Sequence, residues 1–78
     1  MKLVKVQWRD ITTYSDRVPL EKALSLTTTP TTTAGLLLQE DKDDIRVVHS
    51  FWEHEGLVMY GDVTVIPKGC TVDIWREK

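Results

Sequence analysis

Three turn sequences divide the second half of this chain into short runs that favour β-strands. Asp, Gly and Pro residues, which are typical of tight turns, occur in three stretches: the charged stretch Glu40–Asp44, Glu53–Gly56 and Pro67–Gly69. The runs between these turns are rich in β-branched and aromatic residues, which suit a pleated backbone. Short strands joined by tight turns at regular spacing predict a small antiparallel β fold.

Five strands and one short helix account for most of the chain. Val4, Val6 and Trp8 alternate with polar residues, which is the period of a half-buried strand. The predicted strands cover residues 3–8, 36–39, 45–51, 57–66 and 71–75, and the predicted helix covers about residues 19–25. Gly61, in the middle of the fourth strand, predicts a bulge or a sharp bend. The sequence therefore predicts a mainly β fold, either a small five-stranded antiparallel barrel or a strongly bent sheet, with one short helix.

Alternation within the later strands assigns their side chains to two faces. The side chains expected to point inward are Ile45, Val47, His49, Phe51, Val72 and Ile74. Trp52 and Trp75 then point outward, whereas Trp8 is expected in the core. Two interpretations of the outward tryptophans stay open: they cover the ends of a barrel, or they form a subunit or partner interface, where Trp, Tyr and Arg are enriched.

A threonine-rich segment, LTTTPTTTAG at residues 26–35, precedes the second predicted strand. Threonine suits a pleated backbone, but Pro30 cannot take a central position in a sheet ladder. We therefore expect an extended edge or a bent approach to the strand, with Gly35 marking a bend or a close approach of two backbones. The hydroxyl row that includes Thr31 and Thr33 is the predicted docking place for a ligand's phosphates or a partner's edge.

Size and charge limit the classes of function that fit. The 78 residues predict one domain, residues 1–78, with a single small core. A net charge of −2 argues against a general nucleic-acid or membrane-surface binder, which would carry a basic excess. No apolar run approaches the roughly 20 residues that span a bilayer, and no secretion signal is evident. The single cysteine, Cys70, fits a reducing compartment, so the expected location is cytoplasmic.

Neither catalysis nor metal binding is predicted. The serines and Cys70 lie outside any sequence context of a catalytic nucleophile, and no glycine-rich phosphate loop is present. The acidic turn Glu40–Asp44 lacks the residue spacing of a calcium loop, and it is expected to be a solvated hairpin tip. His49 and His54 are not expected to converge with Cys70 on a zinc ion. We expect a protein that is not an enzyme and has no metal and no cofactor.

Several short motifs resemble those of a group of small phage and prophage proteins. The matching elements are Val6-x-Trp8-x-Asp10, Ala34–Leu37, Glu40–Asp41, Ile45–Ser50 and Ile66–Gly69. The resemblance implies a viral origin, and with it a location in the cytoplasm of the host cell. The stretch from Gly35 to Ile74 also resembles an Sm-type barrel, a bent five-stranded sheet that assembles into rings by edge-strand pairing.

The expected function is that of a non-catalytic binding module, phage-encoded and homo-oligomeric. It would occupy a host protein or sequester a small nucleotide-like ligand. The candidate binding residues are Trp52, Trp75, Tyr60, Arg46, Thr31, Thr33 and Lys68. Two alternatives stay open: an Sm-like or SH3-like barrel that binds single-stranded nucleic acid, against which the negative net charge counts, and a minor structural component of a virion.

Overall fold

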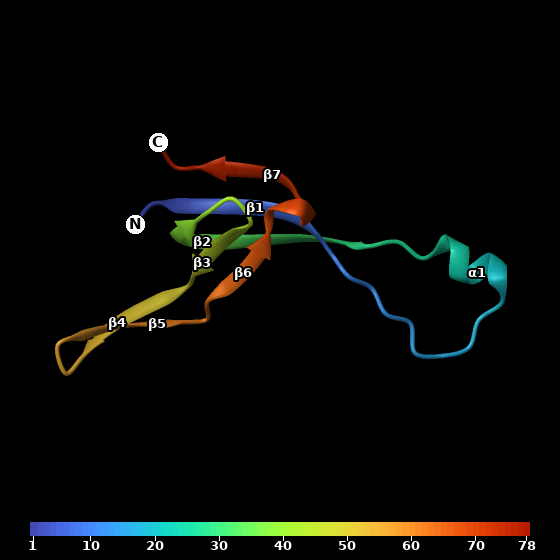
Figure 1. Cartoon of the computed structure of the whole chain (residues 1–78), viewed down its shortest axis with the longest axis horizontal. Coiled ribbons are helices and arrows are strands. Elements are labelled where there is room, and N and C mark those ends of the chain that lie inside the picture. Colours follow the sequence, from blue (N-terminus) through green and yellow to red (C-terminus); the bar gives the residue numbers. More distant parts are fainter.

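A computed structural model describes all residues from 1 to 78 and shows a mainly β protein. The elements in chain order are β1 (Leu3–Asp10), α1 (Leu20–Ser25), β2 (Thr29–Glu40), β3 (Asp44–Val48), β4 (Ser50–His54), β5 (Leu57–Gly61), β6 (Thr64–Pro67), the 3-10 helix η1 (Lys68–Cys70) and β7 (Thr71–Arg76). Five strands form one antiparallel sheet in the order β6-β3-β2-β1-β7, and β4 and β5 form a separate two-stranded sheet (Figure 1). The main sheet does not close into a barrel, so the bent-sheet form of the fold prediction is confirmed.

The core lies on one face of the main sheet. Its buried members are Val4, Val6, Ile45, Val47 and Ile66, against which Trp8, Leu37 and Ile74 pack. Register explains this set, because residues directly opposite on neighbouring strands share a face: Ile45 lies opposite Ile66, and Val6 opposite Ile74. Trp8 donates its indole N–H to the Thr33 hydroxyl at 3.0 Å, which satisfies its polar atom. The prediction that Trp8 belongs to the core is confirmed.

Two register shifts interrupt the ladders of the main sheet. One lies between Leu37 and Gln39, where β2 pairs with β3. The other lies in the β1–β7 pairing, where Gln7 faces Asp73 but Trp8 faces Thr71. Val72 is therefore the extra residue of a bulge and is 67 % exposed, so the expectation that it points inward is wrong. Bulges of this kind add local twist, which is consistent with the strong bend of the sheet.

Both long predicted strands are broken into two. The expected strand 45–51 divides at His49, since β3 ends one residue before it and β4 begins one residue after it in the other sheet. The expectation that His49 and Phe51 face the core is wrong, because side-chain alternation carries over only along a continuous strand. The expected strand 57–66 divides after Gly61, where Asp62 has a φ of 55°. The predicted bend at Gly61 is confirmed.

The threonine-rich segment is the first half of β2. Pro30 lies opposite Arg9 of β1, whereas β3 pairs with β2 only from Leu36 onward. Pro30 therefore has no neighbouring strand on its second side, as expected for an extended edge. At Gly35 an added Cβ would lie 2.8 Å from the Val48 carbonyl oxygen, which confirms the predicted close approach of two backbones.

Candidate binding surfaces

The hairpin of β4 and β5 projects from one end of the main sheet (Figure 1). All residues from Ser50 to Tyr60 are exposed. Its six large apolar side chains are between 42 % and 66 % exposed: Phe51, Trp52, Leu57, Val58, Met59 and Tyr60. Exposed apolar patches are frequent at binding surfaces, so the hairpin is a candidate binding surface.

Both faces of this hairpin carry large apolar side chains. Cross-strand pairing places Phe51 opposite Tyr60, with ring centroids 6.4 Å apart, and Trp52 opposite Met59 on the other face. The two strands pack mainly on each other. A two-stranded hairpin is only marginally stable in water unless a further strand or a helix covers it. The hairpin therefore lacks a covering element in the isolated chain.

A second uncovered segment, residues 11–28, connects β1 to β2 and lies at the opposite end of the molecule (Figure 1). It contains α1, which has only six residues and no buried side chain. Leu20 and Leu24 lie one turn apart on the same side of α1, and they are 74 % and 76 % exposed. A helix this short is not stable in water by itself, so α1 also lacks a packing partner.

The surface area of the whole chain agrees with these local observations. The accessible area is 6144 Å², whereas a compact monomer of 9.0 kDa would expose about 4,900 Å². The radius of gyration is 16.5 Å, against about 11.5 Å for a compact chain of this length. The excess of roughly 1,200 Å² is larger than the ~800 Å² that each partner contributes to an ordinary protein interface.

Trp75 lies on a different surface, on the outward face of β7. It borders a shallow hollow of about 310 Å³ that is also lined by Leu3, Lys5, Ala34 and the neighbouring backbone of β1 and β2. Trp52 and Trp75 are equally exposed, at 52 % and 53 %. Neither belongs to the residues that pack on the core, which leaves both side chains available for contacts outside the chain.

A second hollow, of about 260 Å³, lies beside the threonine-rich segment. It is lined by Gln7, Trp8, Arg9, Pro30, Thr31, Thr32 and Val72. Thr31 donates its hydroxyl to the Thr29 carbonyl oxygen at 3.1 Å, and Thr33 accepts the Trp8 indole on the core face. Of the two threonines predicted to bind a ligand, only Thr31 borders this hollow.

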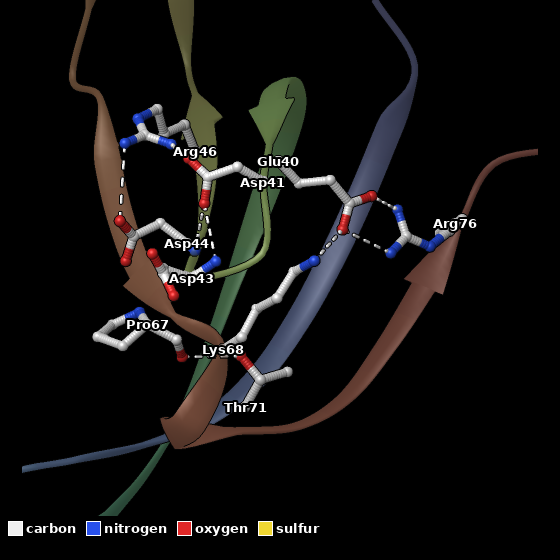
Figure 2. A network of polar contacts seen from close by, with 9 residues as sticks. All are labelled: Glu40, Asp41, Asp43, Asp44, Arg46, Pro67, Lys68, Thr71 and Arg76. Atoms are coloured by element: carbon white, nitrogen blue, oxygen red, sulfur yellow. Dashed lines mark hydrogen bonds and ion pairs between the residues drawn. The ribbon is translucent and has the colours of Figure 1, made fainter.

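Arg46 is held at the tip of the β2–β3 hairpin (Figure 2). Its guanidinium donates to Asp41 at 3.0 Å and lies 3.6 Å from Asp44. The second Asp41 oxygen accepts the backbone N–H groups of Asp43 and Asp44, at 2.9 and 2.8 Å. These backbone bonds, followed by Arg46, hold the pKa of Asp41 below its usual value. The acidic turn is thus an ordered, exposed hairpin tip, as expected.

Glu40 joins three parts of the bent sheet (Figure 2). It forms a bidentate ion pair with Arg76 of β7, in which Nη2 lies 3.1 Å from Oε2, and Lys68 of η1 lies 3.3 Å from the same oxygen. Strand β1 separates β2 from β7, so these side chains meet across the core face of the sheet rather than between neighbouring strands: Glu40 lies opposite Ile45, and Arg76 opposite Val4. Hydrogen bonding to Arg76 and then Lys68 outweighs partial burial and holds the pKa of Glu40 below its usual value.

Glu40→Gln is expected to make the free energy of unfolding depend less on pH in the acidic range. Because the pKa of Glu40 is lowered in the fold from a reference of 4.5, its stabilisation is complete above pH 4.5 and is lost as the pH falls through the folded value. At pH 7 the variant should lose about 1 kcal/mol of the free energy of unfolding. Urea unfolding at pH 7 and pH 3 measures both effects. Asp73→Asn, at an exposed carboxylate of β7, should change neither, and an unaltered acid dependence in Glu40→Gln would contradict the assignment.

The seven candidate residues do not form one site. Trp52 and Tyr60 share the hairpin, although on opposite faces, and the other five lie on or beside the main sheet. The sequence patterns do not single out the remaining apolar residues of the hairpin or the two leucines of α1. The available signal was the unbroken run Leu57–Tyr60, because adjacent apolar residues in a strand occupy opposite faces and require cover on both.

Neither helix is long and apolar enough to cross a membrane. No three side chains of His, Cys, Asp or Glu converge in a group that could hold a metal ion. No protein-family model, curated protein or solved structure matches this chain.

Proposed function

We propose that the protein is a non-catalytic binding module that works as a homo-oligomer and binds a partner protein. The observation that carries this proposal is the hairpin of β4 and β5, whose large apolar side chains are exposed on both faces. Burial of apolar surface is the main driving force of protein association. Self-association through the hairpin would leave the Trp75 surface for the partner. Resemblance to phage and prophage proteins supports a component of the host cytoplasm as that partner.

Two observations favour a protein over a nucleotide-like ligand. The basic residues Arg46 and Lys68 are engaged in ion pairs with carboxylates, so binding a phosphate would require those pairs to open. The hollow at Thr31 is lined mostly by polar side chains, whereas small-molecule pockets are mostly apolar. The aromatic side chains of the hairpin and of Trp75 are, by contrast, about half exposed and of the kind enriched at protein interfaces.

The oligomer is tested by light scattering coupled to size-exclusion chromatography at tens of micromolar chain. The native protein is expected to elute at a multiple of its 9.0 kDa mass. The double variant Trp52→Ser with Tyr60→Ser removes one large side chain from each face of the hairpin and should elute at the mass of a single chain. Trp75→Ser is the matched control, since Trp75 is as exposed as Trp52. It should keep the native mass.

A native protein that is a clean monomer under these conditions would refute the proposal. Unchanged association of the hairpin double variant would assign the contact to another surface. The second half of the proposal predicts that Trp75→Ser keeps its oligomeric mass but loses the protein captured from lysate of the host cell by the native chain. Capture that is equal for both chains would contradict the role of the Trp75 surface.

A further inference from the structure

The β4–β5 hairpin and α1 are both uncovered, and each could supply the packing partner that the other lacks. A two-stranded hairpin becomes stable when a helix packs on its face, and a six-residue helix becomes stable when its apolar side is covered. The hairpin offers an apolar sheet face without a helix, and α1 offers Leu20 and Leu24 without a sheet.

These two segments cannot meet within one chain. They lie at opposite ends of a molecule whose longest dimension is 56 Å, with the main sheet between them (Figure 1). A second copy that is turned end for end brings α1 of each chain to the hairpin of the other. A single two-fold axis then forms both contacts at once, since in such an interface residue i of one chain meets residue j of its partner and the reverse.

We propose that the hairpin of each chain is covered by α1 of a second copy, so that the basic unit is an antiparallel two-fold dimer with two identical helix-on-hairpin contacts. The proposal rests on the proposed function, whose self-association it makes specific. The excess exposed area of roughly 1,200 Å² is enough for the ~800 Å² that a stable dimer buries on each chain. Leu20 and Leu24 are each more than 70 % exposed in the single chain, and both would become buried in this interface.

The hairpin face that carries Phe51, Val58 and Tyr60 is the better docking face for α1. On the opposite face the Trp52 ring folds over the base of the hairpin, where an added Cβ on Gly61 would lie 3.0 Å from its Cζ3 atom. That indole already covers part of its own face. Phe51 and Tyr60 pack on each other, with ring centroids 6.4 Å apart, and Val58 lies two residues along β5 on the same side and is 52 % exposed.

Mass measurement tests whether α1 is needed for association. Leu20→Ser with Leu24→Ser is expected to yield a single chain of 9.0 kDa, or to weaken dimerisation at least tenfold. The main sheet should keep its circular dichroism, because neither leucine is buried. Val72→Ser, which removes an equally exposed apolar side chain from β7, is the matched control and should retain the native mass.

Cysteine cross-linking tests which surfaces touch. In a Cys70→Ser background, a Leu24→Cys chain is mixed with a Val58→Cys chain, allowed to exchange subunits and oxidised under mild conditions. A disulfide-linked pair containing one chain of each kind is expected, and the mixture of Leu24→Cys with Val72→Cys should give none. Val58→Cys chains that link to themselves would show hairpin-on-hairpin pairing and overturn the proposal.

The two proposals fail in different ways. A monomeric native protein contradicts both of them. An oligomer that dissociates in the hairpin double variant, yet survives Leu20→Ser with Leu24→Ser and gives no mixed disulfide, contradicts only the α1 contact. The hairpin would then remain the binding element of the module, with another surface of the second copy against it.

Discussion

Replacing Ile45 with alanine is expected to lower the free energy of unfolding by about 2–5 kcal/mol. Ile45 is 1 % exposed and lies opposite Ile66, which is fully buried, in a core cluster with only five buried members. Removing three of its carbon atoms loses apolar burial and leaves a cavity that a sheet held by ladder hydrogen bonds cannot close. The free energy of unfolding of native proteins is only about 5–15 kcal/mol in total, so this variant should be close to unfolding at room temperature.

Urea unfolding monitored by tryptophan fluorescence measures this loss, with the chain concentration held constant because association contributes to apparent stability. Val65→Ala is the matched control. Val65 lies next to Ile66 on β6 but points to the other face and is half exposed, so the change should remain within about 0.5 kcal/mol. Equal effects at the two positions would show that the inner face is not the core that maintains the fold.

Replacing Gly35 with alanine is expected to cost about 1–3 kcal/mol, although it adds a single methyl group. An added Cβ would lie 2.8 Å from the Val48 carbonyl oxygen and 2.9 Å from Val47 Cγ1. The first of these atoms is backbone, and it cannot move without disturbing the Leu36–Val48 pair that ends the ladder between β2 and β3. The position requires the absence of a side chain rather than an unusual φ.

Gly69→Ala is the control for this substitution. Its Cβ would meet nothing within 4 Å, and its φ lies outside the left-handed region. Alanine reduces the conformational freedom of the unfolded chain, so the stability of Gly69→Ala should be equal to or slightly higher than that of the native protein. Thermal melting of both variants provides the comparison. A Gly35→Ala melting temperature at or above that of Gly69→Ala would show that the approach of β2 and β3 relaxes without cost.

Much of the fold follows from local patterns. Alternation identifies the inner residues of β1, the three turn sequences all lie at turns, and Pro19 marks the residue before α1. Errors occurred where the chain changes direction without a strong breaker. His49 ends β3 although no glycine or proline marks it, and the bulge opposite Gln7 and Trp8 displaces Val72 from the face that its spacing predicts. Both effects depend on which strands become neighbours.

The candidate surfaces were predictable only in part. Trp52, Tyr60 and Trp75 are exposed, and an interface was among the interpretations of the two tryptophans. Alternation alone predicts residues 45–51 and 57–66 as strands of one sheet with one face buried, so it does not predict how many apolar side chains the hairpin exposes. Once the chain bends at His49 and again at Asp62, the segment between them leaves the sheet and its inner face loses its cover.

By itself the sequence determined the local elements: which runs are extended, where turns lie, and that one face of β1 is buried. These properties depend on the conformational preferences of neighbouring residues and on the spacing of apolar side chains, and both can be read directly from the sequence. Only the tertiary structure decided that the sheet stays open, that Glu40 connects β7 and η1 across it, and that a hairpin and a helix remain uncovered at opposite ends. Those outcomes depend on contacts between residues far apart in sequence, and a pattern within a short stretch of sequence does not reveal such contacts.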